Sequence, residues 1–153
     1  MGKILDIASE PVNETYGRLV DLAAQLCRTF SLVWRDQIVF AASAVDVATE
    51  LASVLVREER TDRWPGTVLS DTLATVRHYR FTRESSALLK RPAGLYAWRA
   101  PGLPEDVAFY LADSTAWLTS ISHEREAWFD LAQNGAVEIQ RLVPGLTIRP
   151  RAT

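Results

Sequence analysis

Strand-like segments joined by very short turns occupy much of this sequence. Residues 107–121 predict a β-hairpin with its turn at positions 113–114, in which Val107, Phe109 and Leu111 alternate along one face of the first arm. Residues 29–35 alternate in the same way, and residues 38–42 follow as a return strand after a two-residue turn. Strands joined so closely pair antiparallel, because a parallel connection needs a dozen or more residues. The sequence therefore predicts a mostly antiparallel sheet.

Helical periodicity is found between these strands. Apolar residues recur at spacings of three and four in three main helices, expected over 13–28, 43–60 and 123–133. A shorter helix is expected over 84–91, and further strands over 76–82, 95–99 and 146–149. Helices packed on an antiparallel sheet define the α+β class. The 153 residues, 48% of them hydrophobic, suit a single domain that spans 1–153.

Several function classes are excluded by missing motifs. The glycines form neither G-x-G-x-x-G nor G-x-x-x-x-G-K-[ST], so no nucleotide cofactor is expected. The single cysteine, Cys27, excludes a zinc site built from several cysteines, and its place on an apolar helix face predicts a buried thiol. No metal and no other cofactor is therefore expected. Without a signal-peptide pattern or a run of about 18 apolar residues, we expect a soluble cytoplasmic protein with no membrane partner.

One short stretch, "SHERE" at 122–126, concentrates side chains capable of chemistry. His123 with Glu124 or Glu126 would serve as a general acid–base pair. The zinc-protease motif His-Glu-x-x-His fails because Ala127 takes the place of the second histidine. Ser122 at the start of the predicted helix would cap it, and acids in a first helical turn interact well with the helix dipole. The sequence therefore favours no catalytic residue, and a small enzyme that uses this trio is the alternative.

Tryptophan and arginine side chains are the candidates for binding a partner. Trp64 lies in a Pro/Gly loop with Arg60 and Arg63, where Trp and Arg commonly anchor protein interfaces. The alternative for Trp64 is an indole folded back onto the core. Arg77 and Arg80 are interleaved with aromatic residues, a pattern that binds single-stranded nucleic acid. Strand alternation does not separate these bases from the aromatics, so we expect all five residues to bind a protein rather than nucleic acid.

The segment "LPEDVAFYLADSTAWLTSISHEREAWFDL", residues 103–131, resembles small α+β bacterial immunity proteins of toxin–immunity systems. The resemblance covers under a quarter of the chain. It implies a non-enzymatic bacterial protein that binds a cognate toxin and blocks it by occlusion, and it carries over no binding residues. The net charge of -2 departs from what masking a basic nuclease would favour. A third interpretation is an oligomeric accessory or structural protein in which the helix at 13–28 joins the copies.

Overall fold

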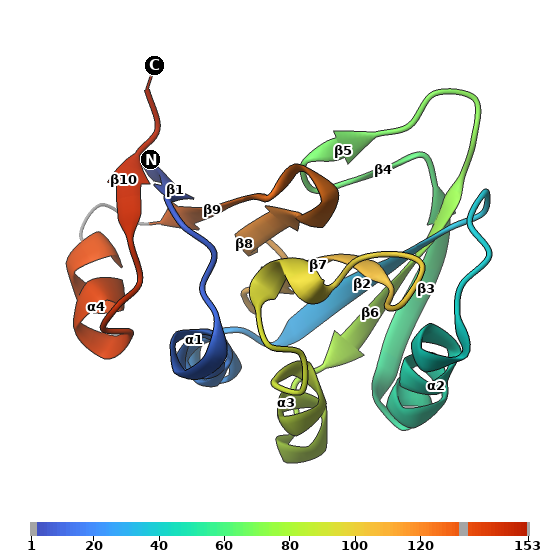
Figure 1. Ribbon diagram of the computed structural model, residues 1–153, viewed down its shortest axis with the longest axis horizontal. Helices are drawn as coiled ribbons and strands as arrows, with labels where there is room; N and C mark the ends of the chain where they lie inside the picture. Colours follow the sequence, from blue (N-terminus) through green and yellow to red (C-terminus); the bar gives the residue numbers. More distant parts are fainter. Residues whose placement is uncertain (1–2, 132–134, 153) are drawn as a thin grey trace.

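The computed structural model describes residues 3–131 and 135–152. In these residues an eight-stranded sheet has the order β10-β1-β9-β8-β7-β2-β6-β3, and all of its strand pairs are antiparallel (Figure 1). The predicted α+β class is confirmed. The strands of this sheet are β1 (Lys3–Ile7), β2 (Thr29–Arg35), β3 (Leu55–Thr61), β6 (Ala74–Arg80), β7 (Glu105–Tyr110), β8 (Ala116–Ile121), β9 (Glu126–Leu131) and β10 (Ile148–Pro150).

Four α-helices in the described residues lie on one side of this sheet (Figure 1). They are α1 (Asn13–Leu26), α2 (Ala42–Leu51), α3 (Arg83–Leu89) and α4 (Gly135–Leu142). Three short 3-10 turns, η1 (Ala52–Val54), η2 (Leu95–Ala97) and η3 (Ser122–Glu124), join elements. Among the described helices, none combines the length and the hydrophobicity needed to cross a membrane.

The main core lies between the sheet and the helices. Alternate residues of the central strands point to this side, as the two-residue period of a strand requires. Buried members of the core are Phe30, Leu32, Phe109, Leu118 and Phe129 from the sheet and Tyr16, Leu19 and Val20 from α1. Because α1 uses its apolar face for this core, that face is not available as a contact between copies of the chain.

A two-stranded hairpin, β4 (Arg63–Trp64) with β5 (Thr67–Val68), covers part of the opposite face. Trp64 packs there in a second cluster with Val33, Ala74 and Val76. Gly66, at the tip of the hairpin, has φ +86° and lies so close to β8 and β9 that a Cβ atom would come within 2.9 Å of the Trp128 ring. The hairpin thus encloses the end of the central strands on the side away from the helices.

Several predicted elements are confirmed, and others are wrong. The helix at 13–28, the strands at 29–35 and 76–82, the helix at 84–91 and the 107–121 hairpin correspond to α1, β2, β6, α3 and β7–β8. β10 lies close to the strand predicted at 146–149. The return strand at 38–42 is wrong: a turn at 36–37 leads into irregular chain, whose Ala41 N–H bonds to the Pro101 carbonyl at 2.9 Å, and α2 follows.

Three other predictions need correction. The helix at 43–60 ends at Leu51, and its charged end forms the edge strand β3 instead. Residues 95–97 of the predicted strand at 95–99 form η2. The helix at 123–133 is replaced by η3 and β9 as far as residue 131, and positions 132–134, including its predicted stop, lie outside the described residues. β1 and α4 were not predicted.

Candidate functional site

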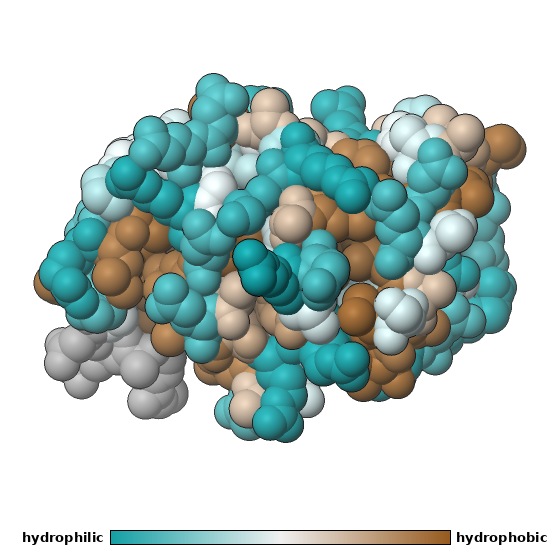
Figure 2. Space-filling model, turned by 90° about the horizontal axis from the view of Figure 1, so that it is seen from below, coloured by the Kyte–Doolittle hydropathy of each residue, from teal (hydrophilic) through white to brown (hydrophobic). Residues whose placement is uncertain are grey.

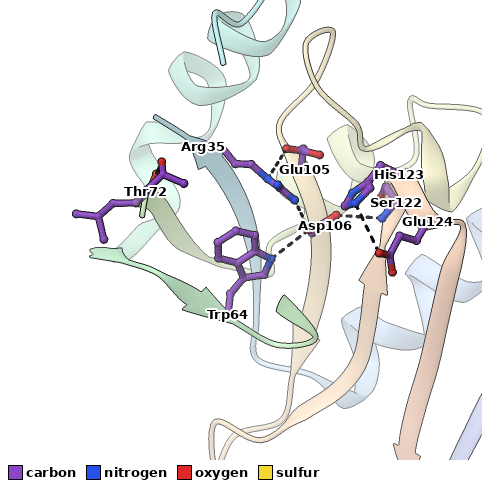
Figure 3. A network of polar contacts seen from close by, with 9 residues as sticks. Arg35, Trp64, Thr72, Glu105, Asp106, Ser122, His123 and Glu124 are labelled. Carbon is purple, nitrogen blue, oxygen red and sulfur yellow. Dashed lines mark hydrogen bonds and ion pairs between the residues drawn. The ribbon is translucent and has the colours of Figure 1, made fainter. Parts of the chain in front are cut away.

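A buried polar network lies where the end of β2, the start of β7 and the end of β8 meet beneath the β4–β5 hairpin (Figure 3). Arg35 is the last residue of β2, and Glu105 and Asp106 are the first two of β7. Ser122 and His123 follow β8 in η3. Adjacent strands of an antiparallel sheet bring these chain ends together although they are far apart in the sequence. We call Arg35, Glu105, Asp106, Ser122 and His123, with Trp64, the acid network.

Two buried carboxylates in the acid network face one guanidinium. Glu105 is 4% exposed and Asp106 1% exposed. The Nε atom of Arg35 lies 3.0 Å from Oε1 of Glu105, and Arg35 Nη2 lies 3.9 Å from Oδ2 of Asp106. Burial raises the pKa of Glu105, an effect that Arg35 opposes and the neighbouring Asp106 charge strengthens. Arg35 therefore balances one of two negative charges.

Asp106 is held in place by two donors from other parts of the chain. Its Oδ1 accepts the backbone N–H of Ser122 at 3.0 Å, and its Oδ2 accepts the indole N–H of Trp64 at 3.1 Å. Its backbone is left-handed, with φ 55°, a conformation that Asp tolerates better than most residues. The carboxylate thus has one orientation, set jointly by the β8 end and the hairpin.

His123 stands at the solvent side of the acid network. Its side chain is 43% exposed, and one atom each from its ring and the Glu105 and Asp106 carboxylates lie within 4.8 Å of one another. The pairing predicted for His123 was different. Glu124 comes no closer than 3.9 Å and is itself exposed, while Glu126 begins β9 and is exposed. The carboxylates gathered near His123 are therefore the buried pair on β7.

The predicted binding residues do not form one site. Trp64 is 8% exposed, so its indole is folded back onto the protein, the alternative to the exposed anchor. Arg63 is exposed and pairs with the adjacent Asp62 at 2.9 Å. Arg80 is exposed and lines a groove between α2 and α3. Arg63 and Trp64 are adjacent on β4, whereas Arg80 lies apart from them at the end of β6.

Arg60 and Arg77 belong to a second feature, the sheet edge formed by β3. Arg60 bonds to the carboxylate of Asp36, with one contact at 3.0 Å. Arg77, on the adjacent strand β6, pairs with Glu58 at 2.7 Å, and its guanidinium lies 4.6 Å from the centre of the Trp34 ring. Both arginines are thus already engaged by groups of this chain.

β3 is an edge strand with little cover. It pairs with β6 alone in the described part of the sheet, and six of its seven residues are exposed. Leu55 and Val56 are 40% and 54% exposed. The register with β6 shifts between Leu55 and Arg57, which makes Val56 the extra residue of a bulge. The edge therefore offers backbone hydrogen-bonding groups and two apolar side chains to solvent.

Cys27 belongs neither to the acid network nor to the β3 edge. It is buried, as predicted, and burial raises its pKa to about 12. A thiol with so high a pKa is not a nucleophile at neutral pH.

The chain shows no similarity that would assign it a function. No model of a known protein family, no curated protein and no solved structure matches it.

Proposed function

We propose that this protein binds another protein by accepting an extended segment of its partner as an additional strand on β3. The observation that carries the proposal is the β3 edge itself, seven residues long, exposed at six of them and unpaired on its outer side in the described residues. An exposed edge of this length is a template for a further strand, because its backbone N–H and C=O groups stay unpaired. Main-chain hydrogen bonds would supply the affinity and the flanking side chains the specificity.

The charges of β3 indicate what kind of segment it would accept. The strand carries Arg57, Glu58, Glu59 and Arg60, a sequence that alone would suggest a highly charged partner. Each of the four has an ionic partner within this chain, however. Arg57 pairs with Glu59 at 3.3 Å, while Glu58 pairs with Arg77 and Arg60 with Asp36. A partner segment of low net charge, with apolar residues opposite Leu55 and Val56, fits this edge best.

The resemblance of residues 103–131 to immunity proteins supports a particular form of this function. In that form the partner is a toxin and this chain is a non-enzymatic cytoplasmic protein of bacteria. The added strand would hold the toxin against the sheet edge and occlude the surface beside it. The charged side chains of β3 are paired within this chain, so recognition at this edge would not depend on masking a strongly basic surface. The net charge of -2 is therefore compatible with this role.

Site-specific cross-linking with matched variants tests the proposal. A photoreactive amino acid at position 56, in the chain expressed in its native host, should capture one partner protein. Val56→Lys should then weaken the reconstituted complex by about tenfold, or about 1.4 kcal/mol, because a charge replaces an apolar contact and blunts the edge. The control is Val137→Lys, on α4 at the other end of the molecule (Figure 1), where the valine is 72% exposed.

Three outcomes would contradict the proposal. The first is equal affinity of the two lysine variants for the partner. The second is cross-linking from position 137 but not from position 56. The third is capture of only a second copy of the chain, which would favour the oligomeric interpretation.

A further inference from the structure

We propose that the acid network binds a divalent transition-metal ion, with His123, Glu105 and Asp106 as its three protein ligands. This inference goes beyond the proposed function, and it rests on no residue of β3. One ligand atom from each of the three residues lies within 4.8 Å of the other two. An imidazole nitrogen with two carboxylate oxygens is a donor set that suits Zn²⁺ or Mn²⁺, whereas Mg²⁺ prefers oxygen donors alone.

A buried polar atom without a hydrogen-bond partner supports a ligand at this place. Ser122 is 0% exposed, and its Oγ has no hydrogen-bond partner in the described structure. Figure 3 shows Ser122 beside His123 and bonded through its backbone to Asp106. Oε1 of the buried Glu105 is, in contrast, already paired with Arg35 Nε at 3.0 Å, although this ion pair falls outside hydrogen-bond geometry. A buried hydroxyl normally finds a partner, so the Ser122 Oγ calls for an ion or another polar ligand close to it.

The surrounding contacts would serve as outer support for such an ion. Metal-binding carboxylates are usually oriented by hydrogen bonds from groups outside the ligand set. The Trp64 indole and the Ser122 N–H orient Asp106 in this way, and Arg35 Nε lies 3.0 Å from Oε1 of Glu105. A carboxylate oxygen has two acceptor positions, so these contacts leave lone pairs for an ion.

Geometry and charge also allow the ion to enter. Tetrahedral zinc with ligands at about 2.0 Å holds neighbouring ligand atoms roughly 3.3 Å apart. The network would have to contract from its present spacing, and His123, whose side chain is 43% exposed, is the least buried of the three ligands. The two carboxylates and the Arg35 guanidinium leave one net negative charge for the cation. Three protein ligands would leave further coordination positions on the solvent side.

Zinc titration of the full chain tests this site. The protein, free of any histidine tag and stripped with a chelator, is titrated with Zn²⁺ by isothermal titration calorimetry. We expect saturable 1:1 binding and a rise in Tm with Zn²⁺. His123→Ala should weaken the binding by about tenfold or more and remove the rise in Tm. Because His123 is half-exposed, this variant should fold, which circular dichroism would check.

Glu124→Gln is the matched control, because Glu124 is adjacent to His123 but outside the ligand set. It should bind Zn²⁺ as the unchanged chain does. The proposal is wrong if the stripped protein shows no saturable 1:1 binding, or if His123→Ala binds Zn²⁺ with unchanged affinity. Loss of binding in Cys27→Ser but not in His123→Ala would likewise overturn it. Neither result bears on cross-linking at position 56, so this inference and the proposed function fail or stand separately.

Discussion

Asp106 connects three segments that are distant in the sequence. One carboxylate receives the N–H of Ser122 from the end of β8 and the indole N–H of Trp64 from the hairpin, and it begins β7 itself. A buried carboxylate that loses a donor keeps its desolvation cost without compensation, so the loss of either bond is expensive. One carboxylate thus joins the hairpin to the start of β7 and the end of β8, beside the apolar packing of Trp64.

Trp64→Phe tests this connection. The substitution keeps an aromatic ring but removes the donor, so the free energy of unfolding should fall by about 1–3 kcal/mol, measured by urea denaturation. Trp34→Phe is the control, because no hydrogen bond of the Trp34 indole is found in the described structure, and its loss should be smaller. Equal losses in the two variants would show that the hydrogen bond to Asp106 contributes nothing to stability.

His78 makes stability depend on pH. It is 6% exposed on β6, with the centre of its ring 5.2 Å from that of Tyr110. Burial lowers its pKa, nearby Arg57 lowers it further, and Glu59 opposes them. The folded state therefore takes up a proton less readily than the unfolded state, whose histidine titrates near pH 6.5. Stability contributed by neutral His78 should be present above about pH 6.5 and be lost as the pH falls below it.

His78→Gln should reduce this loss. The unfolding free energies of the variant and the unchanged chain are compared by urea denaturation between about pH 7 and about pH 5. The variant should have the shallower decline, since its side chain does not titrate. Parallel pH profiles would mean that His78 titrates alike in the folded and unfolded states.

Three members of the acid network, His123, Ser122 and Trp64, were singled out from the sequence, though in separate roles. Its charged members Arg35, Glu105 and Asp106 were missed. His123 was singled out because it lies beside Glu124, Arg125 and Glu126 in the sequence, which made Glu124 and Glu126 its expected partners. Glu105 and Asp106 follow Pro104 and resemble a solvated loop, so their burial was not predictable from local pattern. Only the pairing of β7 with β8 brings them to His123, and that pairing depends on contacts distant in the sequence.

At the scale of elements, two segments that were predicted as parts of helices are strands, β9 and β3. The cause of the wrong prediction differs between them. Residues 126–131 do alternate, with Ala127, Phe129 and Leu131 buried, but the acidic "SHERE" start resembles a helical first turn. β3 has no alternating burial at all, because both of its faces are exposed along nearly all of its length. Its strand conformation comes from pairing with β6 at six of its seven residues rather than from its own side chains. α1, which buries one apolar face, and the hairpin of β7 and β8, whose residues are nearly all buried, were the predictable elements.

The close packing of the hairpin on the sheet predicts a large effect of Gly66→Ala. The new Cβ would lie 2.9 Å from Trp128 and 3.2 Å from both Ile121 and Thr119, on a backbone with φ +86°. Overpacking and a left-handed non-glycine residue together should cost about 2 kcal/mol or more.

Gly102→Ala is the control for Gly66→Ala, because a Cβ at Gly102 would meet no atom within 4 Å. Chemical denaturation should show little change or a slight gain in stability for this variant. Equal stabilities of the two alanine variants would contradict the close contact between the hairpin and β8–β9.

The molecule as a whole has two unlike sheet edges. One is the three-residue strand β10, which pairs with β1 near both chain ends, and the other is the seven-residue strand β3 (Figure 1). On the helix-covered side, Figure 2 shows hydrophobic residues in separate patches among hydrophilic ones. The longer exposed edge is therefore the more distinct surface for a partner.

Hydrogen–deuterium exchange on the complex recovered through position 56 tests the binding of a partner strand most directly. In the free chain, the outward amides of β3 should exchange fast, because no strand pairs with them. In the complex, protection should rise over residues 55–61 and stay unchanged in β10. Unchanged exchange over residues 55–61, with new protection elsewhere, would show that the partner does not add a strand to β3.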